Sequence, residues 1–176
     1  MLLVYIKYFF GQVLCIFLHP IGKIIKKERL IFMASEDTIK LLRECNAGVK
    51  MGVSSIDEVL DQVQNDDFRA LLTECKEKHE TLGNETREML NSYQDSGKEP
   101  NPVAKSMSWV KTHLKTAVEP GDDTIADLIT DGCNMGVKSL HRYLNQYTNA
   151  QPQVQSIAKR LISLETQLTE NVAQYL

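Results

Sequence analysis

The feature that most constrains this chain is a rhythm of apolar residues three and four positions apart, which continues from Ser35 almost to the C-terminus. Since an α-helix turns once every 3.6 residues, such a rhythm places apolar side chains along one stripe of a helix. Segments that alternate between apolar and polar residues, as half-buried strands do, are absent from this part of the sequence. The pattern predicts an all-α protein.

Two stripes separated by a short polar turn predict the first helical hairpin. The first stripe consists of Ile39, Leu42, Asn46, Val49, Val53, Ile56, Leu60 and Val63, and the second of Phe68, Leu72, Cys75, His79, Leu82, Thr86, Met89 and Tyr93. A short turn forces the two helices to run antiparallel. Pairing Val63 with Phe68 across the turn then places Asn46 opposite Thr86. Ser35 is expected to cap the first helix, and Asp66 or Asp67 the second.

Three further stripes follow a break in the helical pattern at Asp95–Pro102 (DSGKEPNP). A short stripe of residues 103–118 predicts a third helix. A fourth helix is expected over about residues 123–147, and a fifth over about residues 152–175. The fifth carries Val154, Ile157, Leu161, Leu164, Leu168 and Tyr175 in register.

A hexapeptide occurs twice, as CNAGVK at residues 45–50 and as CNMGVK at residues 133–138. This offset aligns the first helix with the fourth, and therefore predicts two duplicated hairpins joined by a crossover that carries its own short helix. Short turns within hairpins and one long connection between them are typical of a ferritin-like antiparallel four-helix bundle. Gly48 and Gly136 are expected where backbones approach closely, since glycine is unfavourable within a helix. Asn46 and Asn134 are expected as amides within the core.

The layout also resembles a family. The segments ECNAGVKMG, SMSWVKTHLK and DGCNMGVKSLHRYLNQY are similar to those of bacterial ferritin-like bundles of unknown function, which share the plan of hairpin, crossover helix and hairpin. The resemblance covers residues 36–176 and implies a ferritin-like helical bundle; the cytoplasmic localisation that we expect comes from the cysteines and not from the resemblance.

The ligands of a ferritin-like di-iron centre are not found at their expected spacing. Such centres use a Glu on each of two helices and a Glu-x-x-His motif on each of the other two. No histidine of this chain has a glutamate three residues before it. Cys75 and His79 lie four residues apart and could bind a soft metal, and His141 lies near a stripe. In a ferritin-like bundle a perpendicular two-fold relates the two hairpins, which is expected to place His79 and His141 off-centre in opposite directions, about 10 Å apart, so that they do not share an ion. The sequence therefore predicts no cofactor.

Composition and motifs favour a protein without catalytic activity. The net charge of −3 argues against a nucleic-acid partner, which requires a basic surface. Neither a nucleophile elbow nor a phosphate-binding loop is present. The predicted function is self-association as a homo-oligomer or binding of a protein partner, and the alternative is metal or redox handling at a Cys/His site. The four cysteines form no CxxC pair, and Cys45, Cys75 and Cys133 fall within apolar helical patterns, which predicts structural thiols in a reducing cytosol.

Residues 1–32 are treated as separate from the bundle of residues 33–176. Residues 2–18 are nearly all apolar, and about 18 such residues can span a bilayer. A second interpretation is translated upstream sequence, because Lys27-Glu28-Arg29 can be encoded by a purine-rich ribosome-binding site shortly before Met33. If translation starts at Met33, no membrane association is expected.

Overall fold

A computed structural model describes residues 35–97 and 121–176, and this part of the chain forms four long helices and no strand. The helices are α2 (Glu36–Leu60), α3 (Asp66–Ser92), α5 (Asp122–Gln146) and α6 (Pro152–Val172), and a short 3₁₀ helix, η1 (Ala173–Tyr175), follows. The all-α prediction is confirmed for these residues. The predicted helix over residues 103–118 and the N-terminal residues 1–32 lie outside the described residues.

The helices begin at residues that can stabilise a free N-terminus. Ser35 caps α2, and its side chain accepts a hydrogen bond from the Thr38 amide, as expected. The cap of α3 is Asn65, which accepts a hydrogen bond from the Phe68 amide at 3.0 Å. The expectation of a cap at Asp66 or Asp67 was therefore wrong by one position, and both aspartates lie in the first turn. Pro152 begins α6, where its missing amide hydrogen is not needed.

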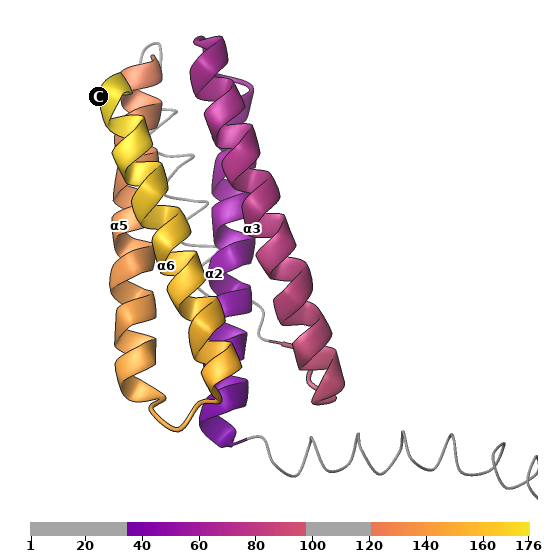
Figure 1. The fold of residues 1–176 in the computed structure, drawn as a ribbon. Helices are drawn as coiled ribbons and strands as arrows, with labels where there is room; N and C mark the ends of the chain where they lie inside the picture. Colours follow the sequence, from indigo (N-terminus) through magenta and orange to yellow (C-terminus); the bar gives the residue numbers. More distant parts are fainter. Residues whose placement is uncertain (1–34, 98–120) are drawn as a thin grey trace, which may run out of the picture.

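The first hairpin has the register that the sequence predicts. Helices α2 and α3 run antiparallel and pack along their length (Figure 1). The Thr86 hydroxyl donates a hydrogen bond to Asn46 Oδ1 at 3.3 Å across the hairpin, and both side chains are buried. The predicted pairing of Asn46 with Thr86 is confirmed.

The second hairpin, formed by α5 and α6, lies beside the first with its ends aligned (Figure 1). The carboxylate of Asp122 at the start of α5 accepts hydrogen bonds from the amides of Gln64 and Asn65 in the α2–α3 turn. At the opposite end, Ser35 donates a hydrogen bond to the Asn149 carbonyl in the α5–α6 turn. Helix α5 therefore runs antiparallel to α2, and α3 ends at the opposite end of the bundle from the start of α5.

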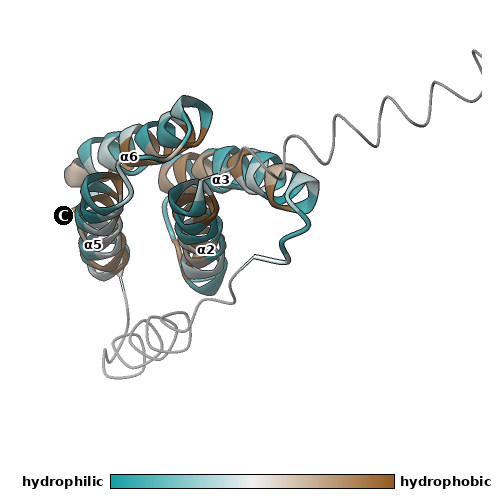
Figure 2. Cartoon of the chain, turned by 90° about the horizontal axis from the view of Figure 1, so that it is seen from below, coloured by the Kyte–Doolittle hydropathy of each residue, from teal (hydrophilic) through white to brown (hydrophobic). Residues whose placement is uncertain are grey.

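The buried side chains of the four helices are mostly apolar, and Figure 2 shows hydrophobic segments of the helices turned toward the neighbouring helices. Helices α2 and α6 each contact the other three, and form the short diagonal of the bundle. One core cluster lies toward the α5–α6 turn and is centred on Leu41, Leu42, Ile157 and Leu161. The second lies toward the α2–α3 turn and is centred on Ile56, Phe68, Leu72 and Ile125. The Phe68 ring stacks on Tyr175 of η1, with centroids 4.3 Å apart.

Two details of the predicted stripes differ from the structure. The inward stripe of α6 passes through Glu165, which is 6% exposed, and leaves Leu164 at the edge of the core. Both positions satisfy three-four spacing between Leu161 and Leu168, and the sequence favoured the apolar one. On α5, Asn134 is exposed although Asn46 is buried. The expectation of a core amide at Asn134 was therefore wrong.

None of the helices in the described residues combines the length and apolar character needed to cross a membrane.

Candidate functional site

Four titratable side chains of the core gather near the middle of the bundle, on three helices, whereas Cys45 and Tyr93 lie in the core cluster toward the α5–α6 turn. Cys75 and His79 are on α3, Cys133 is on α5 and Glu165 is on α6, and none of them is more than 8% exposed. Their charges are not balanced by an opposite charge within the core. Burial without a partner favours the neutral form of each group.

His79 is held against the backbone of its own helix. Its Nδ1 lies 2.9 Å from the carbonyl oxygen of Cys75 and 3.5 Å from Cys75 Sγ. In the neutral ring, Nδ1–H donates to this carbonyl, and Nε2 is an acceptor without a hydrogen-bond partner in the structure. Burial lowers the pKa of His79. The imidazole fits because α2 has glycine at position 52, where a Cβ atom would lie 2.8 Å from the ring.

Glu165 occupies a similar position in the second hairpin. Its side chain packs against Gly136 of α5, where a Cβ atom would overlap Oε2 and lie 2.8 Å from Cδ. Oε2 is buried without a hydrogen-bond partner in the structure. Burial raises the pKa of Glu165 from its ordinary value of 4.5 to about 8. Glu165 is therefore a largely uncharged carboxylic acid at neutral pH.

The thiols of the bundle are buried and free. Cys45, Cys75 and Cys133 form no disulfide, and burial raises the pKa of each to about 12. Glu165 raises the pKa of both Cys75 and Cys133, so the three groups lie within electrostatic range of one another. Thiolates are the nucleophilic and metal-binding form of cysteine, and here they are strongly disfavoured.

The raised pKa values predict slow alkylation in the folded protein. At pH 8, iodoacetamide is expected to modify Cys45 and Cys133 at least about a hundredfold more slowly in the native chain than in the urea-unfolded chain, because little thiolate is present. Mass spectrometry of the two peptides at successive times measures the rates. Equal rates in the two states would show that the thiols are accessible and ionisable.

The structure brings two of the three metal candidates together and separates the third. Cys75 and His79 are in contact, as their spacing predicts. His141 is exposed on α5, so its expected place near a stripe was wrong. Within residues 35–97 and 121–176, no group of three or more His, Cys, Asp or Glu residues has the geometry to hold a metal ion.

A di-iron centre does not fit the side chains of this core. Such a centre needs several inward carboxylates, whereas Glu165 and Glu58, whose carboxylate oxygens are also shielded from solvent, belong to no group of three or more metal-binding side chains in the described residues. The thiols and the imidazole nearby are softer ligands than iron–oxygen chemistry uses in ferritin-like proteins. The potential metal ligands in this core therefore differ chemically from those of a di-iron protein.

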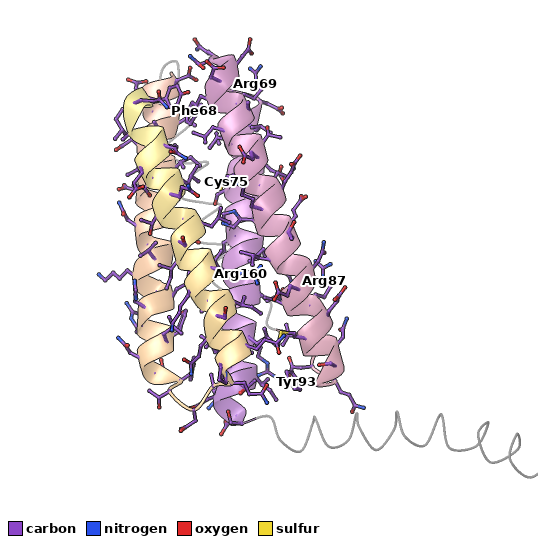
Figure 3. All side chains as sticks on the ribbon, in the orientation of Figure 1. Phe68, Arg69, Cys75, Arg87, Tyr93 and Arg160 are labelled. Carbon is purple, nitrogen blue, oxygen red and sulfur yellow. The ribbon has the colours of Figure 1, made fainter. Side chains whose placement is uncertain are left out.

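A shallow groove between α3 and α6 leads toward the cluster. It has a volume of about 170 Å³ and Cys75 at its floor. Leu71, Leu164 and Leu168 form its apolar walls, and Glu74, Lys78, Gln167 and Asn171 line its polar rim. Figure 3 shows Cys75 in the half of the bundle that also holds Phe68, away from the end marked by Tyr93.

Sequence reasoning missed Glu165 and Gly52 as parts of this site. The signal for Glu165 was its place in the spacing Leu161, Glu165, Leu168, Val172, which is as regular as the one through Leu164. The signal for Gly52 was a second glycine within a long helix, four residues after Gly48. Its partner His79 could be identified only from the packing of the hairpin.

Comparisons with known proteins bear on the fold alone. No family model matches this chain, and no curated protein matches it. The structure superposes on the crystal structure of a DUF305 fragment from Deinococcus radiodurans with a TM-score of 0.65 and 14% sequence identity, covering 80% of this chain and 95% of that one. The chain is therefore similar in fold to a DUF305 fragment, a helical domain of unknown function.

Proposed function

We propose that this chain is a cytoplasmic, ferritin-like bundle that has no di-iron chemistry and acts through self-association or through binding a protein partner. The observation that carries the proposal is the chemical state of the core. Its buried thiols, imidazole and carboxyl group are all held neutral by burial. Side chains in that state pack a core well, and neutral thiols are poor nucleophiles and poor metal ligands.

Support for a ferritin-like arrangement comes from the direction of the helices. Each hairpin is antiparallel, and α3 ends at the opposite end of the bundle from the start of α5 (Figure 1). The two described ends that precede and follow residues 98–120 therefore lie at opposite ends of the bundle, as do the ends joined by the long crossover of ferritin-like folds. The duplicated hexapeptide lies on α2 and α5, which occupy corresponding places in the two hairpins.

Two measurements on the full chain test this function. Size-exclusion chromatography with light scattering over a hundredfold range of concentration is expected to show a homo-oligomer, or a monomer that is recovered with one defined protein after cross-linking in its native cells. Ferrous iron added to the protein is expected to oxidise no faster than in buffer. Stoichiometric iron together with an oxidase rate that disappears in His79→Ala would overturn the proposal.

The contact of Cys75 with His79 favours one alternative, a bundle that handles a soft metal or a redox partner. A thiol and an imidazole on one helix face suit a soft ion. Binding would have to displace the thiol proton, which burial holds strongly. Metal analysis of protein purified without a chelating column distinguishes the two functions, since this alternative requires a soft metal that is lost in both Cys75→Ala and His79→Ala.

A further inference from the structure

The two glycines of the doubled hexapeptide have different surroundings. A Cβ atom on Gly48 would lie 3.6 Å from Leu161 Cδ2, which is an ordinary contact. A Cβ atom on Gly136 would occupy the space of the Glu165 carboxyl group. The absence of a side chain at position 136 therefore creates a notch in α5, and the carboxyl group of Glu165 fills this notch.

Among the described residues, the groups that face Glu165 in its present position include no cation. Gly136 and Cys133 face it from α5, and Cys75 faces it from α3. On α6, the Thr169 hydroxyl donates to the Glu165 carbonyl oxygen and not to its carboxyl group. Helix α2 contributes no charged group that shifts the pKa of Glu165 or of the two thiols. An ionised carboxylate in the notch would therefore be buried and unpaired, which is strongly unfavourable.

The groove between α3 and α6 offers an alternative position for an ionised carboxylate. Leu164 and Leu168, which precede and follow Glu165 on its helix, line this groove together with Cys75. Lys78 lies on its rim, where it pairs with Glu74 at 2.7 Å and acts electrostatically on Cys75. A carboxylate that turned from the notch into the groove would gain water and a nearby ammonium group.

We propose that Glu165 is a proton-operated latch: the neutral carboxyl group closes the contact between α6 and α5 at Gly136, and its ionisation releases the side chain into the α3–α6 groove and opens that groove. The proton passes to solvent, and no other group needs to change its charge. Because α3 and α6 belong to different hairpins, the latch couples pH to the contact between the two hairpins. It goes beyond the proposed interaction function by giving the bundle two states.

The sign of the pH effect follows from the raised pKa of Glu165. Its pKa is about 8 when the latch is closed, and the ordinary value is 4.5. The closed state therefore binds the proton more tightly, and opening becomes more favourable as pH rises from about 4.5 to about 8. Above about pH 8 the carboxyl group is ionised in both states, and the opening equilibrium no longer changes.

Hydrogen exchange of the full chain, measured by mass spectrometry, tests the latch. Protection factors corrected for intrinsic exchange are compared between the parent and Glu165→Gln from pH 5.5 to pH 7.5. In the parent, protection of the α3 and α6 peptides beside the groove is expected to fall by at least about tenfold relative to Glu165→Gln, since linkage allows up to about tenfold per pH unit. Peptides from the first half of α2 are expected to show no such difference.

Matched glycine variants make the test independent of Glu165→Gln, which adds a buried amide. Gly136→Ala fills the notch and is expected to give low protection beside the groove already at pH 5.5. Gly48→Ala, at the corresponding position of the hexapeptide, is expected to keep the pH dependence of the parent. The proposal is overturned if Glu165→Gln retains the fall in protection, if the fall is uniform over all four helices, or if the two glycine variants behave alike.

Discussion

Replacing Glu165 by methionine is expected to favour the folded state much more at pH 9 than at pH 4. The difference in free energy of unfolding, Glu165→Met minus parent, is expected to be about 3–5 kcal/mol larger at pH 9 than at pH 4. At pH 9 the parent must either keep an ionised carboxylate in the notch or open the α3–α6 contact to release it, and both lower its stability, whereas methionine fills the same space without a charge. A rise in pKa from 4.5 to about 8, at about 1.4 kcal/mol for each tenfold change in proton affinity, amounts to about 5 kcal/mol at most. Urea denaturation at each pH, followed by circular dichroism, measures the difference.

Glu165 and His79 change the stability of the fold with pH in opposite directions. The stability that Glu165 contributes is complete below about pH 4.5 and is lost as pH rises to about 8, because its folded pKa is raised. Burial lowers the pKa of His79, so its contribution is instead lost as pH falls below its ordinary value of 6.5. The pH dependence of the parent alone combines both effects, and the comparison with Glu165→Met isolates the carboxyl group.

The control for this prediction is Glu170→Met, which removes an exposed carboxylate from the same helix. Its free energy of unfolding is expected to stay within about 0.5 kcal/mol of the parent at both pH values. A pH dependence in Glu165→Met equal to that of the parent would mean that ionisation of Glu165 costs the folded chain no stability, and it would contradict the prediction.

Phe68→Ala is expected to lower the free energy of unfolding by about 3–5 kcal/mol. The ring is fully buried in the core cluster near the α2–α3 turn, and it stacks on Tyr175 at the C-terminal end. Its removal leaves a cavity between the first hairpin and η1, and takes away the surface against which the C-terminal segment packs. Urea denaturation at neutral pH measures the loss.

Phe68→Leu serves as the matched variant, since it keeps most of the apolar volume and is expected to lose less than half as much. Tyr175→Ala is expected to lose a smaller amount than Phe68→Ala, because Tyr175 is only partly buried. If Phe68→Ala lost less than 1 kcal/mol, the C-terminal end of the bundle would not be closed by this ring stack.

The sequence by itself determined the helices and the register of the first hairpin. Apolar residues spaced three and four apart define which side of a helix faces inward. A short turn between two helices then allows them to pack only in antiparallel orientation. The hydrogen bond between Thr86 and Asn46 follows from these two facts alone. The prediction that Cys75 and His79 lie on one helix face was correct for the same reason, because four residues make nearly one turn.

Only the tertiary structure decided which duplicated positions are equivalent and which polar groups enter the core. An apolar stripe identifies the side of a helix that faces inward, but it does not determine how many other helices pack against that helix. Helix α6 contacts three others, so its buried arc includes Glu165, whereas Asn134 on α5 lies outside the arc that α2 and α6 cover. The notch at Gly136 and the open contact at Gly48 differ for this reason, because long-range packing between helices fixes the space around each glycine and local spacing does not.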